Sequence, residues 1–240
     1  MSKSESNNIH VDLPPNDSVH QHACITLFRT DRLRCFQFPL SIINSVRDAI
    51  NASWINGLQK ETQNIGFYEF KLKGNPWLRS GDEYIPSRIV ILHILSALHS
   101  NGWHLLTSND FCRLLEDNNS FIFQLGVRPS PSLFFAISRY DLDKLHVICA
   151  PSDVIQRIRQ TFGENNIQRE EWLNDARTCY RLKLSGKPWT NDETVSSRIR
   201  LLSLLDCFTS LDCQLHTGIC MNGIIDSAEA DTWIFRRKIQ

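Results

Sequence analysis

One stretch of the sequence occurs twice. Residues 68–77 read YEFKLKGNPW and residues 180–189 read YRLKLSGKPW, so that six of the ten positions are identical. A second pair of segments follows each stretch: residues 87–100 read SRIVILHILSALHS and residues 197–210 read SRIRLLSLLDCFTS. Two matches in the same order indicate an internal duplication, which restricts the chain to an architecture of two similar units.

The correspondence between the two halves extends in both directions from these segments. Most of it holds at one constant offset, by which Asp31 falls on Asp143 and Pro39 falls on Pro151. The offset is slightly shorter through the segment that begins SRI, where Ser87 falls on Ser197, and it returns to its first value at the end of each copy. The unit exceeds the ~20–50 residues of a solenoid repeat, so each copy is expected to be a domain of its own.

The duplication divides the chain into domains and tails. We predict a disordered tail at 1–23, a first repeat domain at 24–123, a linker at 124–135, a second repeat domain at 136–235 and a basic tail at 236–240. The N-terminal tail is expected to be disordered because it is polar and lacks the apolar residues of a core. The last segment contains Arg236, Arg237 and Lys238, which are expected to be solvated.

Each copy alternates apolar and polar residues in its central segment, which predicts a strand. Tyr68, Phe70 and Leu72 point to one side, and Glu69 and Lys71 point to the other. This alternation is typical of an antiparallel sheet with one buried face and one face in water. Helical periodicity precedes and follows the strand. We therefore predict an α+β fold in which each copy is a two-layer β-β-α-β-α-β-β sandwich and the two copies pack as a pseudo-dimer.

The charge balance argues against two classes of partner. Lys and Arg number 26, and Asp and Glu also number 26, so no net field attracts nucleic acid or an anionic membrane. No segment has the ~18–20 uninterrupted apolar residues of a membrane-spanning helix. We predict a cytoplasmic or nuclear protein that binds a protein partner, without nucleic-acid binding or membrane insertion. Its eight cysteines are expected to be reduced thiols.

The repeated segments supply candidates for a ligand site. Trp77 and Trp189 follow Gly-x-Pro, and each is either an aromatic platform for a ligand or a plug that closes the core. Arg88 and Arg198 follow a serine at an expected helix start, where backbone N–H groups and an arginine can bind a phosphate or carboxylate. A structural arginine paired with an acid explains the same recurrence. The hypothetical ligand-binding set is Trp77, Arg88, Trp189, Arg198, Lys71 and Lys183.

Four residues near the C-terminus carry atoms that bind zinc, namely Cys207, Cys213, His216 and Cys220. Their spacing lacks a CxxC knuckle, and the expected change from helix to strand would scatter the ligands. The cysteines are therefore interpreted as small buried thiols, and no metal or cofactor is predicted. Gly-x-Ser-x-Gly, HExxH, GxGxxG and P-loop motifs are absent from the sequence. The sequence thus favours a protein that is not an enzyme, and no catalytic residue is named.

The helix that follows the central strand differs between the copies on its outward side. At equivalent positions the second copy has Arg200, Ser203 and Asp206, and the first has Val90, His93 and Ser96. A helix on the outside of a sandwich normally presents a polar stripe to water. The less polar stripe of the first copy is a hypothetical interface with the other half or with a partner, and drift on an indifferent surface is the alternative.

Two functions from different classes remain. The first is a non-catalytic interaction or scaffold protein built from two duplicated domains, favoured by the duplication, the neutral charge and the missing catalytic motifs. The second is a small-molecule or phosphate-ligand binder that uses the Gly-x-Pro-Trp loop and the Ser-Arg helix start of each repeat.

Overall fold

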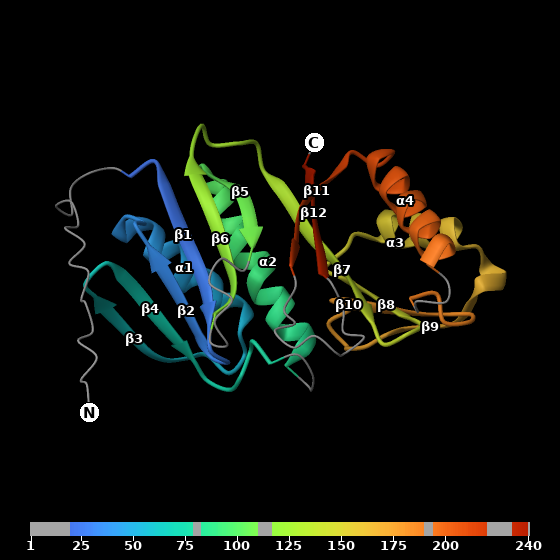
Figure 1. Ribbon diagram of the computed structural model, residues 1–240, viewed down its shortest axis with the longest axis horizontal. Helices are drawn as coiled ribbons and strands as arrows, with labels where there is room; N and C mark the ends of the chain where they lie inside the picture. Colours follow the sequence, from blue (N-terminus) through green and yellow to red (C-terminus); the bar gives the residue numbers. More distant parts are fainter. Residues whose placement is uncertain (1–19, 79–82, 110–116, 190–193, 220–231, 240) are drawn as a thin grey trace, which may run out of the picture.

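The computed structural model describes residues 20–78, 83–109, 117–189, 194–219 and 232–239. Within these residues it contains two six-stranded antiparallel sheets, one in each half of the chain (Figure 1). The two halves have the same α-helices and strands in the same order, and the second half has one additional 3-10 helix. The prediction of an α+β fold that arose by internal duplication is confirmed.

The first repeat forms sheet A, whose strand order is β3-β4-β2-β1-β6-β5. Its elements are β1 (His22–Phe28), β2 (Arg32–Phe36), α1 (Leu40–Ser53), β3 (Leu58–Asn64), β4 (Phe67–Leu72), α2 (Tyr84–Ser100), β5 (Trp103–Asn109) and β6 (Asp117–Leu125).

The second repeat forms sheet B, whose strand order β11-β12-β7-β8-β10-β9 is equivalent to that of sheet A read from the other edge. Its elements are β7 (Ser132–Tyr140), β8 (Lys144–Ile148), α3 (Ser152–Phe162), the 3-10 helix η1 (Glu164–Asn166), β9 (Ile167–Trp172), β10 (Cys179–Leu184), α4 (Thr194–Thr209), β11 (Cys213–Ile219) and β12 (Thr232–Lys238).

The duplicated motif forms strand β4 or β10 and the turn that follows it. Phe70 and Leu72 are fully buried, while Lys71 between them is half-buried on the other face. Gly74 ends the segment with a φ of 82°, a left-handed conformation that favours glycine. A Cβ at this position would lie 2.1 Å from Oε1 of Glu83. The glycine of the motif therefore permits both the turn and the close approach of Glu83.

Each repeat has one strand more than the sequence predicted. Strands β3 and β9 lie at sheet edges and pair with β4 and β10 respectively. The sequence of β3 is LQKETQN, which lacks the apolar alternation of a half-buried strand. Edge strands are often polar because their outer side faces water, and periodicity did not indicate them for this reason.

The boundaries of several predicted elements require correction. Helix α2 begins at Tyr84 and not at Ser87, because Pro86 is tolerated in the first turn, where its missing N–H has no intrahelical partner. Helix α4 likewise begins at Thr194 and not at Ser197. The predicted linker is shortened at both ends, since β6 continues to Leu125 and β7 begins at Ser132.

The predicted tails also differ from the structure. Residues 1–19 of the N-terminal tail lie outside the described residues, and His22 already belongs to β1. The predicted basic tail is wrong, because Arg236 to Lys238 form the end of β12. Arg237 pairs with Asp153 at the start of α3, at 2.5 Å, so this segment is held by partners from other elements.

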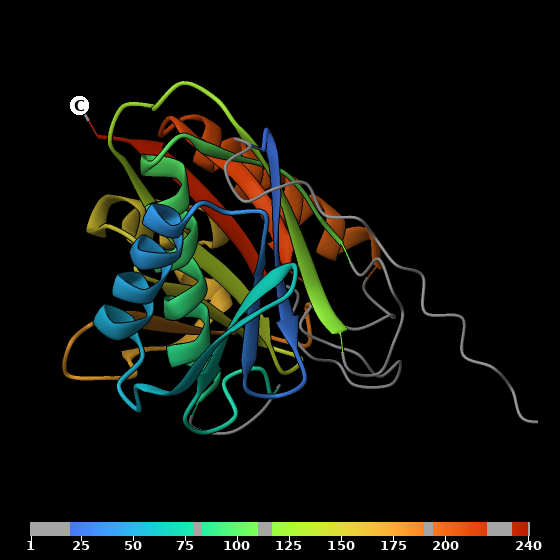
Figure 2. The same cartoon turned by 90° about the vertical axis from the view of Figure 1, so that its left-hand side faces the viewer.

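The two repeats pack with unlike faces. Helices α1 and α2 run side by side and cover one face of sheet A (Figure 2). Helix α2 also contacts β7 and β8 of sheet B, and α3 and α4 lie beyond that sheet (Figure 1). We call the face of each sheet that is turned away from its own helices the outer face. Helix α2 therefore covers the outer face of sheet B. The layers follow in the order sheet A, helices α1 and α2, sheet B, helices α3 and α4, an arrangement that we call head to tail.

Candidate interaction site

The tryptophans of the duplicated motif close the end of a hairpin in both repeats. Nε1 of Trp77 donates to the carbonyl oxygen of Arg32 at 2.8 Å, and Nε1 of Trp189 donates to that of Lys144 at 3.2 Å. Trp77 is 2% exposed and Trp189 is half-buried. In each repeat the indole N–H is thus used to hold the strand that follows the hairpin turn.

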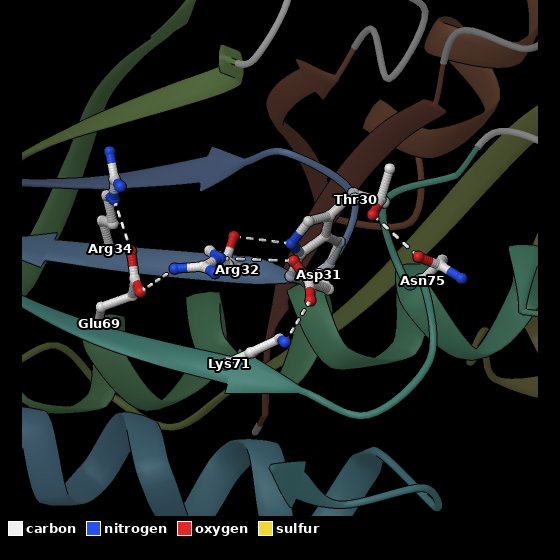
Figure 3. A network of polar contacts seen from close by, with 8 residues as sticks. Thr30, Asp31, Arg32, Arg34, Glu69, Lys71 and Asn75 are labelled. Carbon is white, nitrogen blue, oxygen red and sulfur yellow. Dashed lines mark hydrogen bonds and ion pairs between the residues drawn. The ribbon is translucent and has the colours of Figure 1, made fainter. Parts of the chain in front are cut away.

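The lysines of the motif make the same ion pair in both repeats. Lys71 lies 3.6 Å from Asp31, and Lys183 lies 3.7 Å from Asp143. Figure 3 shows the first of these pairs at the turn between β1 and β2. An aspartate in each hairpin thus accounts for the recurrence of a lysine on the outer face.

A second ion pair of sheet A lies next to this turn. Glu69 accepts hydrogen bonds from Nη1 of Arg32 at 2.6 Å and from Nε of Arg34 at 2.8 Å (Figure 3). Burial alone would raise the pKa of Glu69, but the hydrogen bond from Arg34 and the charge of Arg32 outweigh it and hold the pKa below its ordinary value. The guanidinium of Arg34 stacks 3.4 Å from the ring of Phe28.

Arg88 lies between the repeats and not at a helix start. Its side chain is buried, with Nη1 donating to the carbonyl oxygen of Tyr84 at 3.1 Å and to Oγ of Ser87 at 3.1 Å. Its Nε lies 3.5 Å from Oγ1 of Thr232 in the second repeat. The guanidinium also lies 3.7 Å from the centre of the Tyr84 ring. Arg88 therefore joins the two repeats and lies one turn inside α2, away from its first backbone N–H groups.

A chain of hydroxyl groups continues this contact into sheet B. The hydroxyl of Tyr84 hydrogen-bonds Oγ of Ser138, which lies 2.7 Å from Oγ1 of Thr232. Burial of Tyr84 raises the pKa of its hydroxyl. The ring of Tyr84 packs edge-on against Tyr140 and His146. These polar groups are buried and hydrogen-bonded, which is the condition under which they stabilise a contact.

His99 makes the contact at the other end of α2. Its Nε2 lies 2.7 Å from Nη1 of Arg236, and its ring packs against Phe134 and His216. A guanidinium has no acceptor, so Nε2 of His99 accepts and the ring is neutral. Burial, together with the charges of Arg236 and His104, lowers the pKa of His99 to about 4.

The predicted stripe on α2 does not form one surface. Val90 is buried, His93 is exposed and Ser96 is half-buried. His93 follows Tyr84 by nine positions, which at 3.6 residues per turn places it about 180° around the helix. The side that faces the second repeat carries Tyr84, Arg88 and His99 instead, so the other half does not cover His93. The alternative, contact of this stripe with a partner, stays a prediction.

On helix α4, several residues equivalent to those on the contact side of α2 are exposed. Arg198, equivalent to Arg88, is exposed. Three apolar residues on this helix are also exposed, Val195 at 70%, Ile199 at 59% and Leu202 at 59%. They occur at i, i+4 and i+7 and therefore share one face. We call these three residues the α4 stripe.

The equivalents of the α4 stripe in the first repeat are covered. They are Ile85, Ile89 and Leu92, by the same offset that relates Ser87 to Ser197. Leu92 is only 2% exposed, and Ile85 and Ile89 are half-buried against the core that joins the repeats. Two copies of one helix thus differ in burial at matched positions because α2 has a sheet on each side.

Among the described residues, Cys207, Cys213 and His216 do not form a metal-binding group. Cys207 and Cys213 are buried, while His216 packs against Phe134 and His99 at the contact between the repeats. Cys220 lies outside the described residues. Within the part of the chain that the structure describes, no group of three His, Cys, Asp or Glu side chains is placed to hold a metal. None of the described helices is both long and apolar enough to cross a membrane.

The fold and this contact define a tandem α+β protein whose two domains are copies of each other. A family model for a single domain matches the chain twice, over 21–124 and 133–236. The chain belongs to this domain family and carries two copies of the domain. The matched ranges begin slightly before, and end just after, the repeat limits obtained from the sequence. Neither the curated proteins nor the solved structures contain a match to the chain.

Of the residues that join the repeats, the sequence singled out Arg88 and His216, and neither of them for this contact. Tyr84, Ser138 and Phe134 belong to no motif and have different residues at the equivalent positions of the other copy. The available signal was the composition of α2, where apolar residues occur on almost every side. A helix that is apolar all round is covered on more than one side.

Proposed function

We propose that this protein is a non-catalytic interaction protein in which the exposed α4 stripe binds a protein partner. The observation that carries the proposal is the contrast between Leu92 at 2% and Leu202 at 59% exposure at equivalent positions of the two helices. In the first repeat, this helix face packs on sheet B of the second repeat, which is a domain of the same family. The second repeat retains the face, with three apolar side chains in water.

The energetic argument concerns these apolar side chains. Burial of a Val, Leu or Ile side chain stabilises a contact by about 1.5–3 kcal/mol. Single exposed apolar residues are common, whereas several on one face of a helix are typical of a binding surface. The α4 stripe has this arrangement, and its core-facing residues Leu204 and Phe208 hold the helix on the second repeat.

The alternative function, a ligand binder, depends on side chains that already have partners. Both tryptophans of its residue set donate to backbone carbonyl groups, and both lysines pair with aspartates. A cavity inside the first repeat is lined by apolar side chains such as Ile25, Leu95 and Phe121. Its described lining offers no polar group to orient a ligand. These contacts favour the interaction protein.

Site-specific photo-crosslinking in cells that express the chain tests the proposal. A benzophenone amino acid at Leu202 is expected to give discrete adducts of higher mass. The same amino acid at Ile65, which is 93% exposed in the turn between β3 and β4, is the matched control and is expected to give none. Equal, diffuse labelling from both positions would show that the α4 stripe has no partner and would contradict the proposed function.

A further inference from the structure

Each of the two surfaces that form the contact between the repeats recurs elsewhere among the described residues, where it is more exposed. Within the described residues, α2 supplies a helix face and sheet B supplies an outer face, and these two surfaces bind each other. The same helix face recurs on α4, and the same outer face recurs on sheet A. A chain with a helix face at one end and a sheet face at the other is complementary to a second copy of itself.

The outer face of sheet A matches that of sheet B at the residues that receive α2. In sheet B, Ser138 and Thr232 are register partners on β7 and β12, and they contact Tyr84 and Arg88. Sheet A has the same hydroxyl pair, Thr26 on β1 and Ser120 on β6, again as register partners. The two pairs are related by the same offset that relates Asp31 to Asp143.

The apolar residues around this hydroxyl pair give the second observation. In sheet B they are fully buried and belong to the core that contains α2: Ala136, Ile148, Cys179 and Ile234. Their equivalents on sheet A are half-buried: Cys24, Phe36, Phe67 and Ile122. The same four positions are therefore more exposed on sheet A, as expected for a sheet face on which none of the described helices packs.

The charged residues on the outer face of sheet A pair with one another within the sheet. Glu69 accepts hydrogen bonds from Arg32 and Arg34, and Asp31 pairs with Lys71 (Figure 3). Covering paired charges costs less than covering isolated ones. The network is thus compatible with a helix packed on the outer face of sheet A.

We propose that α4 of one copy packs on the outer face of sheet A of a second copy, in the way that α2 packs on sheet B. The inference rests on the proposed function and names its partner. In this arrangement Ile199 and Leu202 cover Ile122 and Phe36. The two surfaces are different, so the contact is heterologous, and each added copy presents a new free end. Association therefore continues beyond a dimer.

Sedimentation velocity of purified protein at increasing concentration tests this arrangement. Ile199→Glu blocks the helix face and Ile122→Lys blocks the sheet face, and thermal unfolding confirms that each variant is folded. Phe36→Lys replaces Ile122→Lys if the latter lowers the unfolding temperature. Ile65→Glu, at an exposed position in another part of the chain, is the matched control.

The expected results depend on the contact being heterologous. The unmodified protein and Ile65→Glu form species larger than a dimer as concentration rises. Each blocked variant is a monomer alone, because every copy lacks the same face. An equimolar mixture of Ile199→Glu and Ile122→Lys forms a dimer and nothing larger, since one intact helix face meets one intact sheet face.

Two outcomes overturn the inference. A monomer at every concentration of the unmodified protein shows that the copies do not associate. A dimer that survives in either blocked variant alone shows that another surface is used. If photo-crosslinking at Leu202 then gives adducts with a different protein, the self-association is wrong and the proposed interaction function stands. If it gives no adducts, both fall.

Discussion

Arg236 of the second repeat donates a hydrogen bond from Nη1 to Nε2 of His99 in the first repeat, at 2.7 Å. The bond requires a neutral imidazole, because protonation would turn the acceptor into a donor facing a guanidinium. His216 packs beside His99, and burial together with the charge of Arg236 lowers its pKa to about 4. The contact between the repeats is therefore built around histidines that stay uncharged.

This arrangement predicts a loss of stability in weak acid. His99, His216 and His146 have an ordinary pKa of 6.5, lowered to about 4, 4 and 3 in the folded chain, chiefly by burial. Below pH 6.5 the unfolded chain binds protons that the folded chain does not, so the free energy of unfolding falls as the pH falls. The contribution is complete above pH 6.5 and decreases down to about pH 4.

Urea denaturation between pH 7.5 and pH 5 measures this effect in a range above the titration of carboxylates. His99→Gln retains an oxygen acceptor for Arg236 but does not titrate, so its stability is expected to fall less steeply with pH. His22→Gln, at an exposed position, is the control and should behave as the unmodified chain. A free energy of unfolding that is constant from pH 7.5 to pH 5 would disagree with buried neutral histidines.

The hydroxyl contact between Tyr84 and Ser138 predicts an energetic coupling between the repeats. Each of the changes Tyr84→Phe and Ser138→Ala is expected to cost about 0.5–1.5 kcal/mol of unfolding free energy. The double change should cost less than their sum, with a coupling of about 1 kcal/mol, because the two hydroxyl groups bond each other. Ser203→Ala, at a half-buried position of α4 whose hydroxyl donates to the carbonyl oxygen of Ile199, should be additive with Tyr84→Phe. Additivity of the Tyr84 and Ser138 changes would contradict the contact.

The motif tryptophans are expected to act through stability. Trp77→Ala removes a fully buried indole and its hydrogen bond to the carbonyl of Arg32, so it should cost about 3–5 kcal/mol. Trp189→Ala should cost less, because Trp189 is half-buried and its bond to Lys144 is longer. Denaturation of both variants checks the order. The reverse order, or no loss of stability at either position, would favour the interpretation of the tryptophans as ligand platforms.

Much of the fold follows from two features of the sequence. The duplication required two domains of one architecture, and the alternation of Tyr68, Phe70 and Leu72 indicated a sheet with one covered face. This holds for sheet A, whereas sheet B is covered by helices on both faces. Strands β3 and β9 could not be obtained this way. Each of these two strands lies at a sheet edge and pairs with one neighbouring strand. A polar sequence can form the backbone hydrogen bonds of an edge strand without an apolar pattern.

The contact between the repeats was harder to predict because it depends on which side of α2 faces the second repeat. The less polar outward side of α2 indicated a cover, but the stripe of Val90, His93 and Ser96 was placed on the wrong side. A start at Ser87 hid Tyr84, which is the first residue of α2 and bonds Ser138. Because the predicted helix lacked its first turn, it did not contain Tyr84, the residue that shows which side of α2 faces the second repeat.

Matched substitutions at Leu92 and Leu202 test most directly the claim that one helix face is covered and its copy is open. Leu92→Glu places a carboxylate in the contact between α2 and sheet B and is expected to cost at least roughly 2–5 kcal/mol of unfolding free energy, the range of a buried leucine truncation. Leu202→Glu lies on the exposed α4 stripe and is expected to change the same quantity by about 0.5 kcal/mol or less. Both are measured by urea denaturation at low protein concentration. Equal costs at the two positions would contradict the head-to-tail packing of the repeats.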